Sequence, residues 1–410
     1  MAERLAVGLI SGTSLDGVDA ALVRIGGSLE RPRLRLLAFT TVPYPPPVRL
    51  RLLRAAGGEA VTSGEVSDLN FLLGELFAAA ALRVCRQGRV APKRLSVIGS
   101  HGQTIFHQGR PQPFGGRNEG PFVGGGGETS RRQLASTLQI AEPAIIAAKT
   151  GVPVVADFRT ADMAAGGEGA PLIPLVDYLV LGDAGRNTIA LNIGGIANLT
   201  VIPAGGQVEE VFGFDTGPGN MVMDGLVRHF TRGRRSYDVD GRLAAQGKVI
   251  ERLFGDLLRL AFFDRQPPKS AGREQFGGPF LERHFLSRRG AAFKDLLRTA
   301  NELTARSIAE ALQRFVFPRL AIQPGRDRLV VSGGGAHNRL LLARLAEFLP
   351  QLDVRLSDEY GLPADAKEAI AFAVLADRTM HGLPGNLPAV TGARRPVVLG
   401  KVCQPVVGRR

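Results

Sequence analysis

The stretch 11–17 joins two short apolar runs and carries side chains that suit phosphate chemistry. It reads Ser-Gly-Thr-Ser-Leu-Asp-Gly and lies between the runs 6–10 and 18–23. Glycines let backbone N–H groups approach an anion, hydroxyl groups add donors, and the carboxylate of Asp16 can hold a hydrated metal ion. Two β-prone runs with this connection predict a hairpin whose turn binds the phosphates of a nucleotide.

Two further glycine turns follow buried strands. Gly194-Gly195 separates the apolar runs 188–193 and 196–202, and Gly333-Gly334-Gly335 follows the run 329–331. A single turn of this kind is often only a turn. Three of them favour two hairpins that hold phosphates from opposite sides and a third turn, at a helix start, that takes the adenosine. The chain lacks both the P-loop motif and a dinucleotide-binding Gly-x-Gly-x-x-Gly in its first βα unit, which disfavours those two enzyme classes.

The elements that must position these turns alternate between strands and helices. Strands are predicted at 34–40, 95–99, 152–156 and 354–356, and helices at 48–56, 67–85, 242–263, 299–317, 338–349 and 363–380. The second glycine hairpin repeats the first, so we expect a duplicated α/β architecture. Lobe I would comprise residues 1–183 and the returning segment 363–410, and lobe II residues 184–362. Residues 109–132, rich in Gly, Pro and Arg, are expected to form a flexible insertion.

Composition limits the partners. The 410 residues are 44% hydrophobic, and no apolar run reaches the ~20 residues of a membrane span. With two cysteines and no secretory signal at the N-terminus, the simplest expectation is a cytoplasmic protein without a disulfide framework or membrane partner. The net charge of +13 raises nucleic acid as a partner, but the arginines are scattered and aromatic residues make up only 6%. We therefore do not expect nucleic acid to be the main partner.

A set of ordered motifs extends over nearly the whole chain, at 11–19, 101–104, 137–140, 157–159, 169–172, 191–199, 215–220, 268–274 and 332–338. With these motifs the chain resembles the anhydro-N-acetylmuramic acid kinases, a family of the actin, hexokinase and Hsp70 superfamily. The chain departs from the family at the 109–132 insertion and at Ala141, where the family usually has glycine.

This resemblance implies a fold and a reaction. The fold would be the two-lobed, ribonuclease H-like duplicated actin/hexokinase-like ATPase fold with an interlobe cleft. With ATP and Mg²⁺, the enzyme would open the 1,6-anhydro ring of anhydro-N-acetylmuramic acid with water and phosphorylate O6. The products would be ADP and N-acetylmuramic acid 6-phosphate, which serves peptidoglycan recycling. A homodimer is what the family suggests.

Roles for individual residues follow from the same resemblance. Asp157, at a strand end, would be the general base for the water; the alternative is a carboxylate that caps the next turn. Glu368 would orient water or metal, unless it is simply an exposed helical residue, and Asp16 would meet Mg²⁺ through water. The expected ATP-binding residues are Gly12, Thr13, Ser14, Leu15, Asp16, Gly17, Val18, Asp19, Gly194, Gly195, Asn198, Gly333, Gly334 and Asn338.

The expected substrate contacts are polar or glycine positions at strand ends: Gln103, Thr104, Gln139, Arg159, Asp215 and Gly217. Arg159 would meet the lactyl carboxylate or the γ-phosphate, or else brace Asp157. His101 is either a ligand contact or a hydrogen-bonded structural residue, and no physical role is evident for Lys269. Two functional alternatives stay open: another sugar or carboxylate kinase of the superfamily, and a non-catalytic actin-like ATP-binding module.

Overall fold

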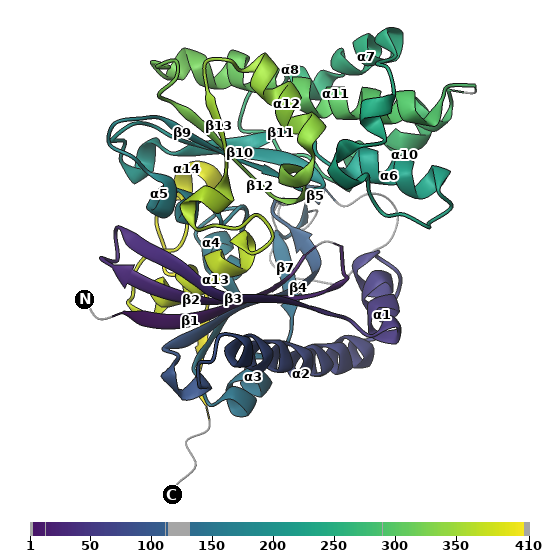
Figure 1. Ribbon diagram of the computed structural model, residues 1–410. Coiled ribbons are helices and arrows are strands. Elements are labelled where there is room, and N and C mark those ends of the chain that lie inside the picture. The colour runs from purple at the N-terminus through teal and green to yellow at the C-terminus, as the bar shows by residue number, and fades with distance from the viewer. Residues whose placement is uncertain (1–2, 13, 111, 114–131, 289, 406–410) are drawn as a thin grey trace, which may run out of the picture. The chain divides into compact units, whose positions relative to one another are not determined.

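The computed structural model describes residues 3–12, 14–110, 112–113, 132–288 and 290–405. Thr13 and most of the predicted insertion 109–132 lie outside the described residues. The chain divides into two compact units, Met1–Val176 with Glu368–Arg410 and Asp177–Lys367. The chain passes from one unit to the other at two places, and both lie in helices. These helices are α5 (Pro174–Leu181) and α13 (Lys367–Met380), the latter at its start (Figure 1). Among the described helices, none combines the length and the apolar character that crossing a membrane requires.

The first unit is built on a seven-stranded sheet with the order β14-β8-β4-β1-β2-β3, in which β7 also pairs with β4. The pairs β1–β2 and β2–β3 are antiparallel, whereas β1–β4 and β4–β8 are parallel. The strands are β1 (Arg4–Ser11), β2 (Gly17–Gly27), β3 (Pro32–Pro43), β4 (Val97–Gln108), β7 (Ser136–Ile140), β8 (Val154–Ala156) and β14 (Lys401–Cys403), with a separate pair β5 (Gln112–Pro113) and β6 (Arg132–Gln133). The other helices are α1 (Pro46–Ala56), α2 (Ser63–Gln87), α3 (Pro143–Thr150), α4 (Phe158–Ala164) and α14 (Pro388–Thr391).

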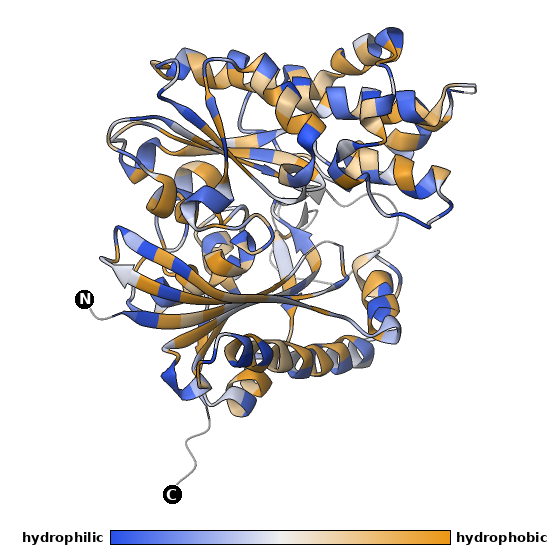
Figure 2. Ribbon diagram, in the orientation of Figure 1, coloured by the Kyte–Doolittle hydropathy of each residue, from blue (hydrophilic) through white to orange (hydrophobic). Residues whose placement is uncertain are grey.

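Helices cover both faces of this sheet. Val7 and Leu9 of β1 share a core with Phe77 of α2. Successive side chains of a strand point to opposite faces, so Gly8 faces the other way, toward α13. A Cβ on Gly8 would lie 1.7 Å from the Ala369 carbonyl oxygen, so α13 lies directly against the backbone of β1. Figure 2 shows the apolar centre of the strands and the mixed polar and apolar surface of α2.

The second unit repeats the same strand pattern. Its sheet has the order β11-β10-β9-β12-β13, with antiparallel β9–β10 and β10–β11 and parallel β9–β12 and β12–β13. Each sheet is thus a three-stranded meander continued by two parallel strands, which confirms the predicted duplicated α/β fold. The strands are β9 (Thr188–Ile193), β10 (Ile196–Ile202), β11 (Phe212–Pro218), β12 (Arg328–Ser332) and β13 (Asp353–Leu356).

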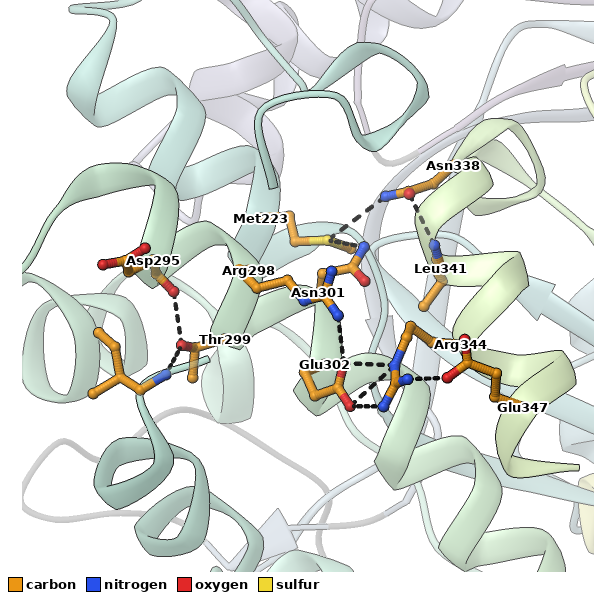
Figure 3. Close-up of polar contacts among 11 residues, drawn as sticks. Met223, Asp295, Arg298, Thr299, Asn301, Glu302, Asn338, Leu341, Arg344 and Glu347 are labelled. Atoms are coloured by element: carbon orange, nitrogen blue, oxygen red, sulfur yellow. Dashed lines mark hydrogen bonds and ion pairs between the residues drawn. The ribbon is translucent and has the colours of Figure 1, made fainter. Parts of the chain in front are cut away.

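The helices of the second unit pack into two cores. Leu191 and Val331 of the sheet pack with Ile308 of α11, while the N-terminal half of α11 joins an aromatic core with α6 and α7. Glu302 of α11, 5% exposed, forms an ion pair with Arg344 of α12 (Figure 3). The helices are α6 (Met221–Phe230), α7 (Glu251–Leu258), α8 (Ala261–Asp264), α9 (Arg273–Phe276), α10 (Gly278–Leu281), α11 (Phe293–Ala311) and α12 (Arg339–Phe348).

The predicted continuous helix 242–263 is wrong. The chain is extended at Gly247, with φ −96° and ψ 173°, and only α7 and α8 are α-helical within this range. A Cβ on Gly247 would lie 2.1 Å from the Lys294 carbonyl oxygen. The backbone is therefore packed tightly against the first turn of α11, and this tertiary contact overrides the helical periodicity.

Candidate active site

The first glycine turn connects β1 and β2 as the sequence predicted. Ile10 pairs with Asp19, and the Leu15 amide donates to the Gly12 carbonyl at 3.3 Å. A Cβ on Gly12 would meet no atom within 4 Å, whereas a Cβ on Gly17 would lie 2.5 Å from the Val42 carbonyl oxygen. Gly12 therefore leaves open space beside the turn, while Gly17 is required by packing against β3.

The side chains of this turn divide into exposed polar groups and buried apolar groups. The Ser14 hydroxyl donates to Asp16 Oδ1 at 2.7 Å, and both residues are exposed. Leu15 and Val18 belong to the core, so only their backbone groups could meet a ligand. Asp19 accepts a hydrogen bond from the Thr41 hydroxyl at 2.6 Å.

The pairing of β4 with β7 brings three predicted sugar-binding residues together, and Gln103 and Thr104 lie inside β4 and not at the strand end that the sequence predicted. Thr104 and Gln139 are partners in the strand pair, and Gln139 Nε2 donates to Thr104 Oγ1 at 3.1 Å. Among the described residues, none is a hydrogen-bond partner of the buried Gln139 Oε1. Gln103 is only 2% exposed, and its Oε1 accepts from the Ser11 hydroxyl at 2.5 Å. The Gln103 side chain thus ties β4 to β1.

Asp157 follows β8 and has a left-handed backbone, with φ 60°. Its Oδ2 pairs with Lys401 Nζ of β14, a partner that local sequence patterns could not reveal because 244 positions separate the two residues. The carboxylate lies at a cavity of about 410 Å³ in the first unit. Side chains that line the same cavity include those of Ser100, His101, Gln139 and Lys401.

Arg159 is held by neutral acceptors. Its Nε donates to His101 Nε2 at 3.1 Å and its Nη1 to the Gly169 carbonyl at 3.2 Å. His101 Nδ1 must then carry the proton and donate to the Gly102 carbonyl, 3.1 Å away. Burial, reinforced by the charge of Arg159, lowers the pKa of His101 to about 3. Burial also lowers the pKa of Arg159 to about 10, while the nearby Glu368 carboxylate opposes that shift.

In the second unit, two segments lie against the Gly194-Gly195 turn, one at Asn220 and one at Gly333. The Asn220 amide, at the start of α6, donates to the Gly194 carbonyl at 2.7 Å, and Asn220 Nδ2 donates to the Ile193 carbonyl at 3.1 Å. A Cβ on Gly333 would lie 2.9 Å from the same Ile193 oxygen. The second and third predicted glycine turns therefore lie side by side, as nucleotide binding by both would require.

A row of polar side chains crosses this sheet beside the turns. Ser332 of β12 pairs with Asn192 of β9, Asn192 with Asn198 of β10, and Asn198 with Asp215 of β11. Paired residues of neighbouring strands lie on the same face. Asn192 was not predicted as a site residue, although a polar residue in an otherwise apolar strand was a signal for it.

Asp215 is positioned by the segment that precedes α9. Its amide donates to the Lys269 carbonyl at 3.0 Å, and its Oδ2 accepts from the Ala271 amide at 2.8 Å. Gly217, two residues later, has φ 151°, and a Cβ there would lie 2.8 Å from the Phe263 ring. The glycine at position 217 is therefore explained by packing.

Asn338 caps the N-terminus of α12, because its Oδ1 accepts from the Leu341 amide at 3.1 Å. Its Nδ2 and that of Asn301 both face the sulfur of Met223, at 3.9 and 3.6 Å (Figure 3). The residue is 8% exposed. The Asn338 side chain therefore has a structural role within the second unit, because it caps α12.

Two sheets that share a five-strand topology, each with a glycine turn between its first two strands, form the duplicated α/β architecture expected of the actin, hexokinase and Hsp70 superfamily. The family model described as "Anhydro-N-acetylmuramic acid kinase" matches residues 4–115 and 122–405. The chain belongs to this family.

Individual relatives agree with the family match. A protein of Caldanaerobacter subterraneus subsp. tengcongensis with the same name is 43% identical over 98% of this chain and 97% of its own length. A protein of Gloeobacter violaceus with the same name is 45% identical over 98% of this chain and 99% of its own length. Component A of the (R)-2-hydroxyglutaryl-CoA dehydratase of Acidaminococcus fermentans covers 92% of this chain and 99% of its own, at 11% identity and a TM-score of 0.42, which is too remote to inform the site.

Proposed function

We propose that this protein is an ATP-dependent kinase that opens the 1,6-anhydro ring of anhydro-N-acetylmuramic acid with water and phosphorylates O6. The products are N-acetylmuramic acid 6-phosphate and ADP, and the reaction serves peptidoglycan recycling. The observation that carries this proposal is the family match across almost the whole chain. The duplicated sheet with its glycine turns supports it, because such turns supply backbone donors to phosphates.

Phosphoryl transfer depends on positioning and on charge stabilisation. In the first unit, Gly12 offers open backbone beside exposed Ser14 and Asp16. Gly195 is exposed at the corresponding turn of the second unit. We assign the phosphates of ATP to the backbone donors of these turns.

Magnesium fits this arrangement only in a hydrated form. Among the described residues, there is no group of three or more His, Cys, Asp or Glu side chains that could hold a metal ion. Mg²⁺ commonly keeps several waters and binds through one or two carboxylates and the phosphates of the substrate. Asp16, exposed at the first turn, suits that mode, and the ion would neutralise charge on the phosphates.

The attacking water needs a general base, and two carboxylates compete for this role. Asp157, the predicted base, borders the 410 Å³ cavity, but its Oδ2 is already engaged by the Lys401 ammonium. Asp215 ends the polar row of the second unit, and backbone groups hold it in a fixed orientation. We place the base at Asp215 and leave Asp157 as the alternative that experiment must exclude. Glu368, whose charge acts on Arg159, is proposed to orient water or metal.

Coupled ADP release, with and without anhydro-N-acetylmuramic acid, tests both parts of the proposal. The wild type should release ADP only with the sugar, and Asp215→Asn should lower kcat by about 10²–10⁴-fold, the usual contribution of a general base. In Asp157→Asn, kcat should fall by about tenfold or less. In Asp256→Asn, at a surface ion pair with Arg259, kcat should not change. ATP affinity should stay within about twofold in all three variants. Loss of turnover in Asp157→Asn alone would return the role to Asp157.

The same assay separates the alternatives. An actin-like ATP-binding module would bind ATP and show no sugar-dependent ADP release. Another kinase of the superfamily would release ADP with a different sugar or carboxylate in a substrate panel. The homodimer that the family suggests and the cytoplasmic location expected from the sequence are further proposals, and light scattering of the purified chain tests the first.

A further inference from the structure

The ammonium group of Lys269 lies in an aromatic enclosure. Lys269 is 7% exposed, and its Nζ lies 4.9 Å from the ring centroids of both Phe262 and Phe315. Phe214 adds a third ring at 6.0 Å. The same Nζ donates to the carbonyls of Phe262 and Phe263 at 3.3 and 3.4 Å. Ring faces and carbonyl oxygens here take the place of water around the cation, so the side chain has one defined position.

The backbone next to this ammonium holds Asp215 at two points. The Lys269 carbonyl accepts from the Asp215 amide, and the Ala271 amide donates to Asp215 Oδ2, at 3.0 and 2.8 Å. Both the main chain and the carboxylate of Asp215 are therefore bonded to the segment that the Lys269 side chain anchors. A shift of this segment would move the carboxylate with it.

The charges around Lys269 favour a positioning role over a ligand-binding one. Burial, with smaller contributions from Arg314 and Arg265, lowers the pKa of Lys269 to about 8, while Asp264 and Asp215 oppose the shift. The lysine is therefore largely charged at neutral pH. The cavity that it lines with Ser307, Glu310 and other residues of the second unit has a volume of about 10 Å³. That space holds about one water and no substrate.

We propose that Lys269 is a positioning residue that, by anchoring residues 269–271 in the aromatic enclosure, fixes the orientation of the Asp215 carboxylate. This gives a physical role to the 268–274 motif. Its kinetic consequence rests on the proposed function of Asp215, but the anchoring itself does not.

Kinetics of Lys269→Met provide the first test. Methionine keeps an unbranched side chain in the enclosure and removes the charge and the donors. A catalytic group displaced by about 1 Å can cost on the order of 10²-fold in rate. We expect kcat to fall by about 10–100-fold with the KM for ATP within about twofold, and Lys269→Arg to recover part of the loss. Lys248→Met, at an exposed lysine of the same unit, should behave as the wild type.

Amide hydrogen exchange provides a readout that does not depend on activity. In Lys269→Met, exchange should accelerate at Asp215 and Ala271 and remain unchanged in β9 and β12. If Lys269→Met does not fold, Phe262→Leu removes one ring of the enclosure and should give smaller changes of the same kind. Wild-type kcat and wild-type exchange at both amides would overturn the proposal. Faster exchange in a protein that releases no sugar-dependent ADP would support the anchoring and reject the proposed function.

Discussion

His101 shows how tertiary structure gives one residue a single role. Its ring lies against Phe372, with centroids 4.6 Å apart, and both of its nitrogens have partners. As an acceptor from Arg159, it must be neutral, and protonation would break that bond. The sequence left open whether His101 contacts ligand, and the geometry supports the structural role.

His101 should make the folded protein less stable as the pH falls below neutrality. The folded state has a pKa of about 3 for this group, below the ordinary value of 6.5. Above pH 6.5 neither state binds the proton, so the contribution is fully present; as the pH falls, the unfolded state binds a proton that the folded state excludes, and stability is lost. At pH 4 the free energy of unfolding lost through this proton uptake amounts to roughly 3 kcal/mol.

Urea unfolding of His101→Gln between pH 4 and 7.5 measures this contribution. The variant should lose less stability on acidification than the wild type. His229→Gln, at an exposed histidine, should follow the wild-type curve. Parallel curves for wild type and His101→Gln would contradict the buried neutral histidine.

At the scale of elements, α13 depends on two glycines of the first sheet. A Cβ on Gly99 of β4 would lie 2.1 Å from the Phe372 carbonyl oxygen, a contact like that of Gly8 with Ala369. The helix backbone thus lies directly on β1 and β4, and it carries Phe372, which packs against His101 and Phe158. The position of α13 therefore determines the surroundings of Arg159.

Gly8→Ala should destabilise the first unit by more than about 3 kcal/mol, because neither backbone can yield without moving a whole element. Gly64→Ala is a matched control near the start of α2. There the nearest atom to a new Cβ is Thr62 Oγ1 at 3.8 Å, and alanine favours the helix. Thermal unfolding should show a large loss for the first variant and none for the second. Equal midpoints would refute the close packing of α13.

At the scale of the whole molecule, one buried ion pair joins the two ends of the second unit. Asp177 and Lys367 are its first and last residues, and Asp177 Oδ1 lies 2.7 Å from Lys367 Nζ, with both side chains 5% exposed. Lys367 Nζ also donates to the Ser332 hydroxyl at 3.2 Å. Burial raises the pKa of Asp177, and the lysine opposes that shift. The pair thus fastens together the points where the chain enters and leaves this unit.

Removing one partner of this pair should cost more than removing both. Asp177→Ala leaves a buried ammonium without its counter-ion, which costs about 3–5 kcal/mol. The double variant Asp177→Leu/Lys367→Met replaces the pair by apolar groups and should recover most of that loss. Urea unfolding of the single and double variants measures both values. A double variant no more stable than the single would show that the pair is not coupled in this way.

The amino-acid sequence by itself determined the features that depend on neighbouring residues. The glycine turns at 11–17 and 194–195, the repeated hairpin and the helix that begins after Asn338 all follow from local turn, strand and capping preferences. The ordered motifs were also sufficient to predict the family.

Only the tertiary structure decided features that depend on residues far apart in the chain. The pairing of Asp157 with Lys401, the polar row that ends at Asp215, and the enclosure of Lys269 arise from strand register and side-chain packing. The break at Gly247 and the packing role of Gly217 have the same origin. Local preferences amount to a few tenths of a kcal/mol to about 1 kcal/mol per residue, and close packing between distant segments outweighs them.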